Sequence, residues 1–273
     1  MNQFLHLLVN PSSGLPSDLW VPSTKNAPPE TSSQVSLTYY RKPNDNFRFS
    51  LGGFYRTFDG LLEYTNPTDL IQALVIDQSV VNFDVSDRSW EERITVGDGF
   101  AYGVELDLNG IVNNKWRYHL AYTYSRSFRR LPETSLFSDF FPYKYDRPHN
   151  LSFQLSRPLG PGVCQINFVF GNGVKWTLPE AQDPSQSNPR TIALRRNNRE
   201  LGGFYHHLDI HYSLKKSIYR TDDLTFNFGI YNVYNEQNPF YGYLLQGNQA
   251  GQAPVKEISL FPILPQFNVK FEW

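Results

Sequence analysis

Cysteine is almost absent from this sequence of 273 residues, which carries a single one, Cys164. One thiol cannot close a disulfide within the chain, so a fold stapled by internal disulfides is excluded. A zinc site built from several cysteines is excluded for the same reason. Cys164 is expected to pack as a small apolar side chain.

A strong net charge and long apolar runs are missing as well. The formal net charge is −1 and the pI is about 6.6, so the chain lacks the basic surface that binds nucleic acid, and nucleic acid is not an expected partner. No apolar run reaches about 18 residues, which argues against a transmembrane helix, and the first residues lack the basic start and cleavage site of a signal peptide. Membrane-spanning strands remain possible, because each needs only about 9 to 11 residues with one apolar side.

Aromatic residues are abundant instead, at 16% of the chain with 17 Tyr and 21 Phe, beside 18 Gly and 19 Pro. This mixture favours strands and turns over helices. The segment "FAYGVELDLNG" alternates apolar residues from Phe100 to Leu108 with polar or small ones, and "WRYHLAYTYS" repeats the pattern from Trp116. Such period-two alternation indicates strands with one apolar and one polar face.

The same alternation predicts about ten strands, each uncertain by a few residues. They are expected at 2–9, 32–40, 46–57, 99–109, 115–127, 149–157, 163–171, 204–214, 223–234 and 265–273. Short connections such as "GIVNN" and "PLGPG" alternate with long ones, and a short helix is expected within the longest, at "TDLIQALVID". Outer-membrane barrels have short periplasmic turns and long outward loops, so this order predicts an antiparallel transmembrane β-barrel with its long loops outside.

A soluble β-sandwich also alternates, with its apolar faces meeting in a dry core. Two features weaken that alternative: Tyr and Trp gather near strand ends, as in interfacial girdles, and the polar face carries many charged groups, as in a wet lumen. The residues expected to face the lumen are Glu105, Asp107, Arg117, His119, His207, Asp209 and His211.

The chain ends on "FNVKFEW", in which apolar residues alternate up to the last position. Chain ends are usually polar and frayed, so an aromatic terminus needs an explanation. Val269, Phe271 and Trp273 resemble the terminal-strand signal that the barrel assembly machinery recognises during insertion of outer-membrane barrels. The alternative is an ordinary edge strand, which leaves Trp273 unexplained.

Stretches distributed over nearly the whole chain resemble the C-terminal barrel portion of TonB-dependent receptors, of the kind abundant in Bacteroidetes. They include "GFAYGVELDLNG", "FPYKYDRPHNLSFQLS", "RNNRELGGFYHHLDIHYSL" and "FNFGIYNVYNEQNPFYGY". The resemblance implies a barrel of about 22 strands whose lumen holds a plug, with a periplasmic box that TonB pulls. Residues 1–273 then form one unit, a barrel fragment without the plug and the N-terminal strands.

Backbone chemistry supports the idea of a fragment independently of the family. Each unpaired backbone group in hydrocarbon costs several kcal/mol, so a sheet with two free edges is not stable against lipid. The strands at 2–9 and 265–273 therefore need partners. Ten strands pairing first to last is an alternative, but long loops and a charged inner face favour a wider lumen.

Candidate catalytic and metal-binding patterns are weak. His207, Asp209 and His211 alternate on one strand face, as metal ligands would, but polarity of a lumen explains them equally. Asp146 and His149 lie near each other in "YDRPHN", without a nucleophile in a recognisable setting. No catalytic residue, metal ligand or cofactor is predicted, and the chain is not expected to be an enzyme.

Recognition residues are expected in the outward loops. Trp20, Trp90 and Trp176 are rigid aromatics of the type that dominates binding surfaces, and Arg195 and Arg196 are positioned to meet an anionic ligand. Packing of the tryptophans on the barrel rim and simple solvation of the arginines are the alternatives.

The expected function is TonB-dependent uptake of a scarce nutrient across the outer membrane of a Gram-negative cell. The cargo is open between siderophore, vitamin, glycan and peptide, because specificity would lie in the loops and the plug. The expected partners are outer-membrane lipid, the TonB complex through the missing plug, the barrel assembly machinery and a small nutrient ligand. A passive porin or adhesin-like barrel, and a secreted soluble β-sandwich that binds carbohydrate, are the alternatives.

Overall fold

The computed structural model describes residues 2–3, 5–8, 19–64, 90–132, 138–176, 179–180, 193–194, 199–200, 203–217, 223–244 and 255–272. Almost all regular structure in these residues is β-strand, with one short 3₁₀ turn, η1 (Trp90–Arg93). No helix in this part of the chain has the length and hydropathy needed to cross a membrane. The prediction of an all-β fold is confirmed.

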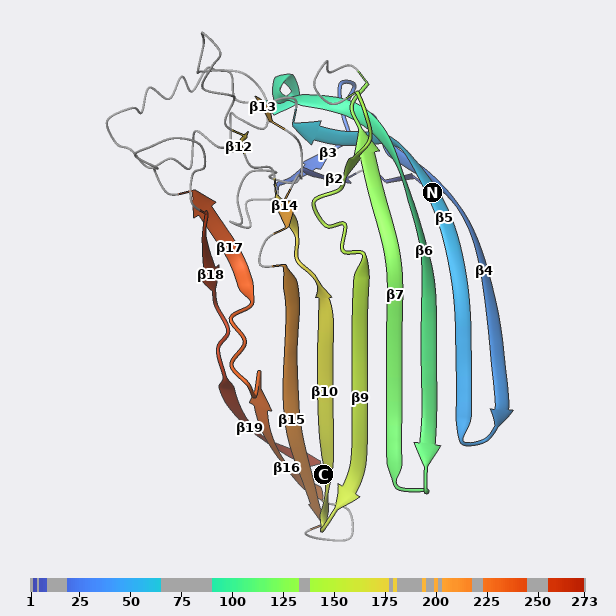
Figure 1. Cartoon of the computed structure of the whole chain (residues 1–273), viewed down its shortest axis with the longest axis vertical. Helices are drawn as coiled ribbons and strands as arrows, with labels where there is room; N and C mark the ends of the chain where they lie inside the picture. The colour runs from blue at the N-terminus through green and yellow to red at the C-terminus, as the bar shows by residue number, and fades with distance from the viewer. Residues whose placement is uncertain are drawn as a thin grey trace.

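One large antiparallel sheet contains the long strands, arranged side by side in chain order (Figure 1). The strands are β1 (Asn2–Gln3), β4 (Glu30–Asn44), β5 (Phe47–Tyr64), β6 (Ile94–Val112), β7 (Trp116–Arg130), β9 (His149–Leu159), β10 (Gly162–Asn172), β15 (Phe204–Ser217), β16 (Asp223–Tyr231) and β19 (Leu264–Glu272). β8 (Phe141–Pro142) adds to β7 beside this path. Every neighbouring pair is antiparallel, as the alternation predicted.

Four small hairpins extend the connections at one end of the sheet. They are β2 (Leu5–Leu8) with β3 (Leu19–Pro22), β11 (Lys175–Trp176) with β14 (Arg199–Glu200), β12 (Pro179–Glu180) with β13 (Ala193–Leu194), and β17 (Pro239–Leu244) with β18 (Val255–Ser259). The prediction treated the segment of β17 and β18 as loop, which is wrong. The helix expected at 68–77 lies outside the described residues.

The strand predicted at 2–9 is also wrong in part. Only β1 joins the large sheet, whereas β2 pairs with β3. The reason is a small core: Leu8 is fully buried with Val21, Ala27 and Leu62, and Tyr64, Ile94 and Val96 pack around it. Burial of these apolar side chains at the end of β5 and β6 draws β2 away from the sheet.

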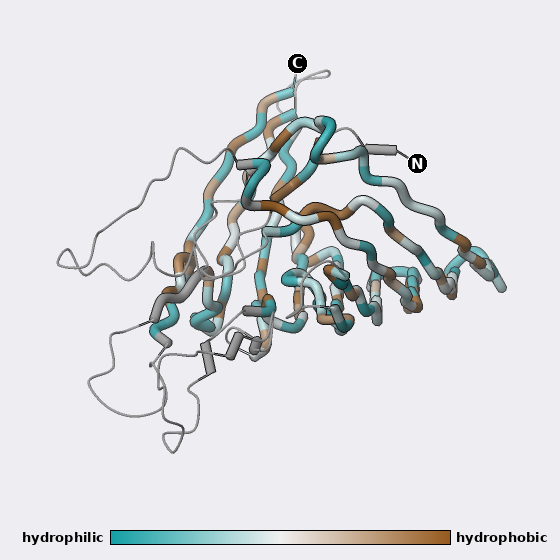
Figure 2. The backbone as a smooth tube through the Cα atoms, turned by 90° about the horizontal axis from the view of Figure 1, so that it is seen from above, coloured by the Kyte–Doolittle hydropathy of each residue, from teal (hydrophilic) through white to brown (hydrophobic). Residues whose placement is uncertain are grey.

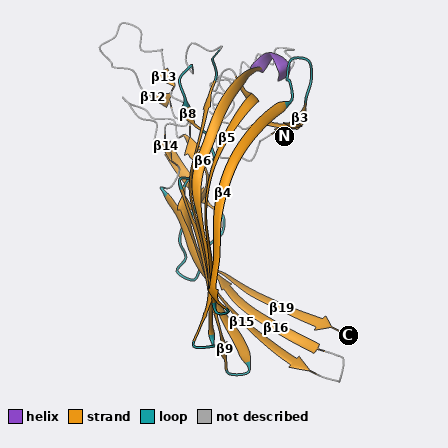
Figure 3. Ribbon diagram, turned by 90° about the vertical axis from the view of Figure 1, so that its right-hand side faces the viewer, coloured by secondary structure: helices purple, strands orange, loops and turns teal. Residues whose placement is uncertain are grey.

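The long strands form a single twisted layer (Figure 3), and the small β2–β3 hairpin packs against it at the end of β5 and β6. Its path ends at β1 and β4 on one side and at β19 on the other, and these edges do not pair with each other. All nine residues of β19 are exposed. An open antiparallel sheet of this length agrees with the prediction that the chain is a fragment of a barrel.

The two ends of the sheet differ, and we name them by their connections. At the turn end, short turns connect β4 to β5, β6 to β7 and β9 to β10 (Figure 1). We call the opposite end, where β5, β7, β10 and β16 finish, the loop end (Figure 1). The turn between β6 and β7 consists of Asn113, Asn114 and Lys115, and the two asparagines have φ angles of +51° and +52°. Two consecutive left-handed residues form a type I′ hairpin, which asparagine tolerates best after glycine.

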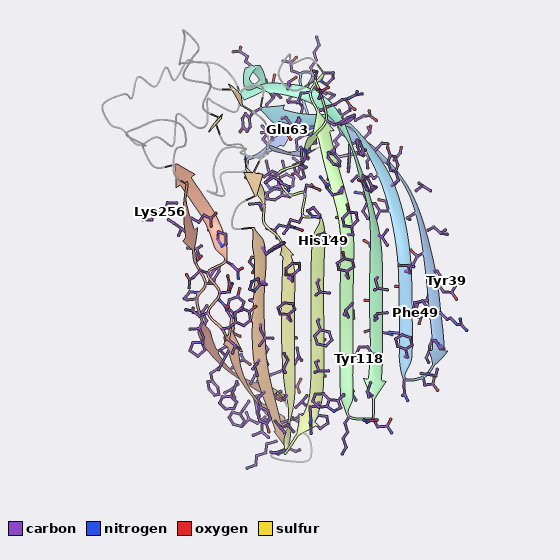
Figure 4. The ribbon with its side chains drawn as sticks, in the orientation of Figure 1. Tyr39, Phe49, Glu63, Tyr118, His149 and Lys256 are labelled. Atoms are coloured by element: carbon purple, nitrogen blue, oxygen red, sulfur yellow. The ribbon has the colours of Figure 1, made fainter. Side chains whose placement is uncertain are left out.

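Side chains divide the sheet into an apolar and a polar face, because the register is continuous across it. One row of directly paired residues runs Phe49, Leu108, Leu120, Phe153, Phe168 and Leu208 from β5 to β15. The row displaced by one residue runs Arg48, Asn109, His119, Gln154, Asn167 and Asp209. Figure 2 shows the resulting alternation of hydropathy along the strands. Tyr39, Phe49 and Tyr118, labelled in Figure 4, belong to the apolar face of β4, β5 and β7.

Glycines on the polar face of β6 let the sheet coil tightly. A Cβ atom at Gly103 would lie 2.6 Å from the carbonyl oxygen of Tyr124 and 2.8 Å from the Phe54 ring, and one at Gly99 would lie 2.4 Å from the carbonyl oxygen of Phe128. Glycine at such positions permits close approach of neighbouring strands. Gly99 and Gly103 therefore allow β6 and β7 to approach closely on the polar face.

We expect Gly103→Val to destabilise the sheet by about 1–3 kcal/mol, because the added side chain collides with main chain that cannot move aside. Ala101→Val, two residues away on the same face of β6, already has room for a Cβ atom and is the matched control. Urea unfolding of the lipid- or detergent-bound chain, followed by tryptophan fluorescence, measures both. Equal midpoints for the two variants would contradict the close approach at Gly103.

Candidate functional site

The polar face of the sheet is the candidate functional surface, and all seven residues predicted to face a lumen lie on it. They do not form one cluster. Asp107 and His119 meet across β6 and β7, whereas His207 and Asp209 form a second group on β15. Glu105, Arg117 and His211 stand apart from both groups, opposite Thr123, Ser156 and Gly229 in the register.

The first group is a carboxylate that holds an imidazole. His119 Nε2 lies 2.6 Å from Asp107 Oδ2. The side-chain amide of Asn109 donates a hydrogen bond to Oδ1 of the same carboxylate. The side chains of His119 and Asp107 remain about two-fifths exposed, at 42% and 43%. This pair fixes the orientation of the His119 ring on an open part of the polar face.

The second group is more buried and belongs to the structure of the loop end. His207 Nδ1 lies 3.0 Å from Asp209 Oδ1, and the same oxygen accepts a hydrogen bond from the main-chain N–H of Asn232 at 2.9 Å. The rings of Tyr205 and Tyr231 flank His207, with centroid distances of 5.6 and 4.7 Å. Asp209 therefore ties β15 to the chain that follows β16, in addition to shaping the polar face.

Asn232 is the residue of this group that the sequence analysis missed. It is fully buried with φ of +53°, and its side-chain amide donates to the carbonyl oxygens of Glu236 and Phe261, at 2.9 and 3.2 Å. The side-chain oxygen Oδ1 of Asn232 accepts a hydrogen bond from the Glu236 N–H at 2.8 Å. The repeated asparagines of "YNVYNEQNP" were the available signal, because asparagine tolerates a left-handed backbone and hydrogen-bonds the chain nearby.

Between the two groups, the polar face of β9 and β10 carries uncharged side chains. Asn150, Ser152, Gln154 and Ser156 alternate along β9, and Gln165 donates to Asn167 on β10 at 2.9 Å. Amides and hydroxyls present both donors and acceptors without a fixed charge. This strip can hydrogen-bond neutral polar groups. Within the described residues, no three His, Cys, Asp or Glu side chains converge as metal ligands would.

Three arginines of β7 stabilise the loop end. Arg129 lies on the polar face, where its guanidinium contacts Glu63 at 2.5 Å and covers the Tyr143 ring at 3.7 Å from the centroid. Arg126 and Arg130 lie on the apolar face and hold Asp146 and Asp98, at 3.1 and 2.9 Å. Each of these three arginines thus has a carboxylate partner.

A bulge in β5 makes the contact of Glu63 possible. The register passes from Asp59 opposite Asp98 to Leu61 opposite Gly97, which leaves Gly60, with φ of +77°, as the extra residue. Because one added residue reverses the alternation, Glu63 reaches the polar face beside Arg129.

Asp146 and His149 have structural partners rather than each other. Asp146 is buried and accepts from Arg126 and from the N–H of Ser127, at 3.1 and 2.8 Å. His149 begins β9 and its Nδ1 lies 2.8 Å from the Tyr122 hydroxyl. Two groups held apart in this way do not form an acid–base pair.

The predicted recognition residues are only partly described. Trp20 lies in β3 and is 60% exposed. Trp90 begins η1 and Trp176 ends β11, so all three tryptophans belong to segments at the loop end, and their role in recognition stays a prediction. Arg195 and Arg196 lie outside the described residues. Of the predicted terminal signal, Val269 and Phe271 are exposed on β19, and Trp273 lies outside the described residues.

The chain was compared with known proteins. The family model described as "TonB dependent receptor-like, beta-barrel" matches residues 12–233. Comparison with curated proteins gave no match. A solved structure titled "Copper transporter OprC" is similar with a TM-score of 0.47 and 12% identity, over 91% of this chain and 32% of that one. The chain spans about a third of that transporter's length. The family match covers most of the chain, which therefore belongs to the TonB-dependent receptor-like β-barrel family.

Proposed function

We propose that this chain forms part of the barrel wall of an outer-membrane receptor that takes up a scarce nutrient with energy delivered through TonB. The apolar face meets lipid and the polar face lines the lumen, with Glu105, Asp107, Arg117, His119, His207, Asp209 and His211 in its wall. Trp20, Trp90, Trp176, Arg195 and Arg196 are the proposed ligand contacts in the outward segments.

The height of the apolar band is the observation that supports this proposal. On β7 the apolar face runs from Trp116, an amphipathic anchor, to Arg126, and on β15 it runs from His206 to Lys216. Each interval is ten positions, or roughly 33 Å along a strand. With a strand tilt of about 40°, both correspond to a height of about 25 Å, which is that of the apolar band in outer-membrane barrels.

Exposure of the band supports lipid as the neighbouring medium. Large side chains such as Leu37, Val104, Phe267 and Phe271 are 83, 49, 63 and 47% exposed. A soluble protein rarely leaves an apolar surface of this extent uncovered. Tyr102 and Tyr55 on the same face add the aromatic character typical of the interface.

The open edge at β19 supports a place at the seam of a larger barrel. Among the described residues β19 is the last strand of the sheet, and Val269 and Phe271 lie on its apolar face. Pairing with a further strand satisfies its backbone groups in lipid. We propose that this strand, with Trp273, is also the part that the barrel assembly machinery recognises.

We expect Leu120→Arg to lower the amount of protein in the outer membrane and to reduce its stability by about 2–4 kcal/mol, because position 120 lies near the middle of the apolar band. Ala121→Arg is the matched control at the same height on the opposite face, where its register neighbour is Asp107. Fractionation, detergent extraction and urea titration compare the two. A chain that stays in the aqueous phase without detergent would overturn the proposal.

We expect deletion of the encoding gene to abolish uptake of one labelled nutrient from a panel of iron–siderophore, cobalamin, oligosaccharide and peptide. Collapse of the proton-motive force with an ionophore should stop uptake in the parent strain while binding to the cell surface persists. Transport that continues after the collapse would instead indicate a passive channel. Growth on the limiting nutrient provides the independent readout.

A further inference from the structure

Three cations on the apolar face near the turn end are not explained by uptake. They are Arg41 on β4, Arg157 on β9 and Lys216 on β15, and the register places each in a row with apolar or small neighbours: Phe49, Cys164 and Leu224. Arg41 and Lys216 are exposed, and Arg157 is partly exposed. A cation on this face needs a counter-charge or water when the surrounding medium is hydrocarbon.

No carboxylate supplies that counter-charge. Among the described residues, the apolar face near the turn end carries no Asp or Glu, and none of the three cations has an ion pair there. Arg157 instead lies over the Trp116 ring, 4.5 Å from its centroid, and its Nε reaches only the Pro158 carbonyl, at 3.4 Å. The cation–π contact orients the guanidinium without neutralising it.

In contrast to these three cations, three lysines at the same end of the sheet have carboxylate partners. Lys42 holds Asp45 in the turn at 2.6 Å, and its hydrogen bond keeps the pKa of Asp45 below the usual value. Lys215 and Lys270, on the polar face, hold Asp223 and Glu272 at 2.6 and 2.5 Å. At the opposite rim, Arg126 and Arg130 of the apolar face are also paired. The unpaired cations of the apolar face thus concentrate at the turn end.

Strand tilt brings the three cations to one height. When strands tilt by about 40°, positions at the same membrane depth on two neighbouring strands differ by roughly 1.2 residues from the hydrogen-bonded register. Over the six neighbouring pairs from β4 to β15, the difference adds up to about seven residues. The row through Arg41 meets β15 at Leu208, and Lys216 lies eight positions further toward the turn end. Arg157 falls between them, four positions beyond the same row on β9.

The loop-end border of the band shifts in the same direction. Three strand pairs separate Arg126 on β7 from His206 on β15. The register row through His206 meets β7 at Tyr122, which lies four positions nearer the turn end than Arg126. The expected shift is about four residues. The cations therefore follow the lower border of the band, at the depth of the lipid headgroups.

We propose that Arg41, Arg157 and Lys216 bind the phosphate groups of anionic phospholipids in the periplasmic leaflet. This inference rests on the proposed function, because it requires the apolar face to meet lipid. Arg157 on Trp116 is the best formed of the contacts: the indole lies at the interface and the guanidinium offers paired N–H donors to phosphate oxygens.

The test uses the whole chain, diluted from urea into vesicles of dioleoylphosphatidylcholine, alone or with about one dioleoylphosphatidylglycerol in five lipids. Flotation of the vesicles gives the bound fraction and the partition coefficient. We expect the anionic vesicles to bind more strongly, by about fivefold for each cation and so roughly a hundredfold for three. Salt at about 0.5 M should largely remove this preference.

Substitutions test whether the three cations, and not other residues of the chain, cause the preference for anionic vesicles. The triple variant Arg41→Gln, Arg157→Gln, Lys216→Gln should lose the preference while still binding neutral vesicles. The double variant Arg41→Lys, Arg157→Lys keeps the positive charges and should retain most of the preference for anionic vesicles. Arg48→Gln, a surface arginine at the same end on the polar face, is the matched control and should behave as the parent chain.

The outcomes distinguish the two proposals. A chain that fails to float with either vesicle overturns the lipid-facing assignment, and this inference with it. A chain that binds both vesicles equally, or a triple variant that keeps the preference, overturns the inference alone. Stronger binding to vesicles that contain lipid A than to those with phosphatidylglycerol also overturns it, because the turn end would then belong to the outer leaflet.

Discussion

A continuous antiparallel register over the part of the sheet between the turn end and the Gly60 bulge is the constraint on which the rest of the molecule depends. Main-chain hydrogen bonds align ten strands so that every second side chain points to the same face. A slip of one residue at β6 would move Asp107 to the apolar face and Leu108 to the polar face. The register therefore decides which side chains form the apolar face, which form the polar face and which charges become neighbours.

Much of the sheet could be predicted from the sequence because it depends on this short period. The strand from Phe100 to Leu108 lies within β6, and the turn residues Asn113 and Asn114 lie within the predicted "GIVNN". Strand ends were less predictable: β5 continues to Tyr64 and β6 begins at Ile94, well into the predicted loop. Packing against β2 and β3 stabilises these extensions, and no local pattern encodes such contacts.

The polar face illustrates a different limit of sequence reasoning. Alternation placed Asp107, His119, His207 and Asp209 on one side of the sheet correctly, since that requires only the period. It could not pair Asp107 with His119 across two strands, because the pairing depends on register. Nor could it foresee that Asp209 shares its carboxylate oxygen with the main chain of Asn232. Those contacts divide the surface into a rigid part near the loop end and a more open part over β6 and β7.

The extra residue at Gly60 has a consequence for how this wall can change over time. Before it, odd-numbered positions of β5 lie on the apolar face, and beyond it the alternation is inverted, so that Glu63 lies on the polar face beside Arg129. The upper and lower portions of one strand are thus subject to opposite rules of substitution. Substitutions beyond the bulge can therefore change the loop-end rim without altering which positions of β5 must stay apolar before the bulge.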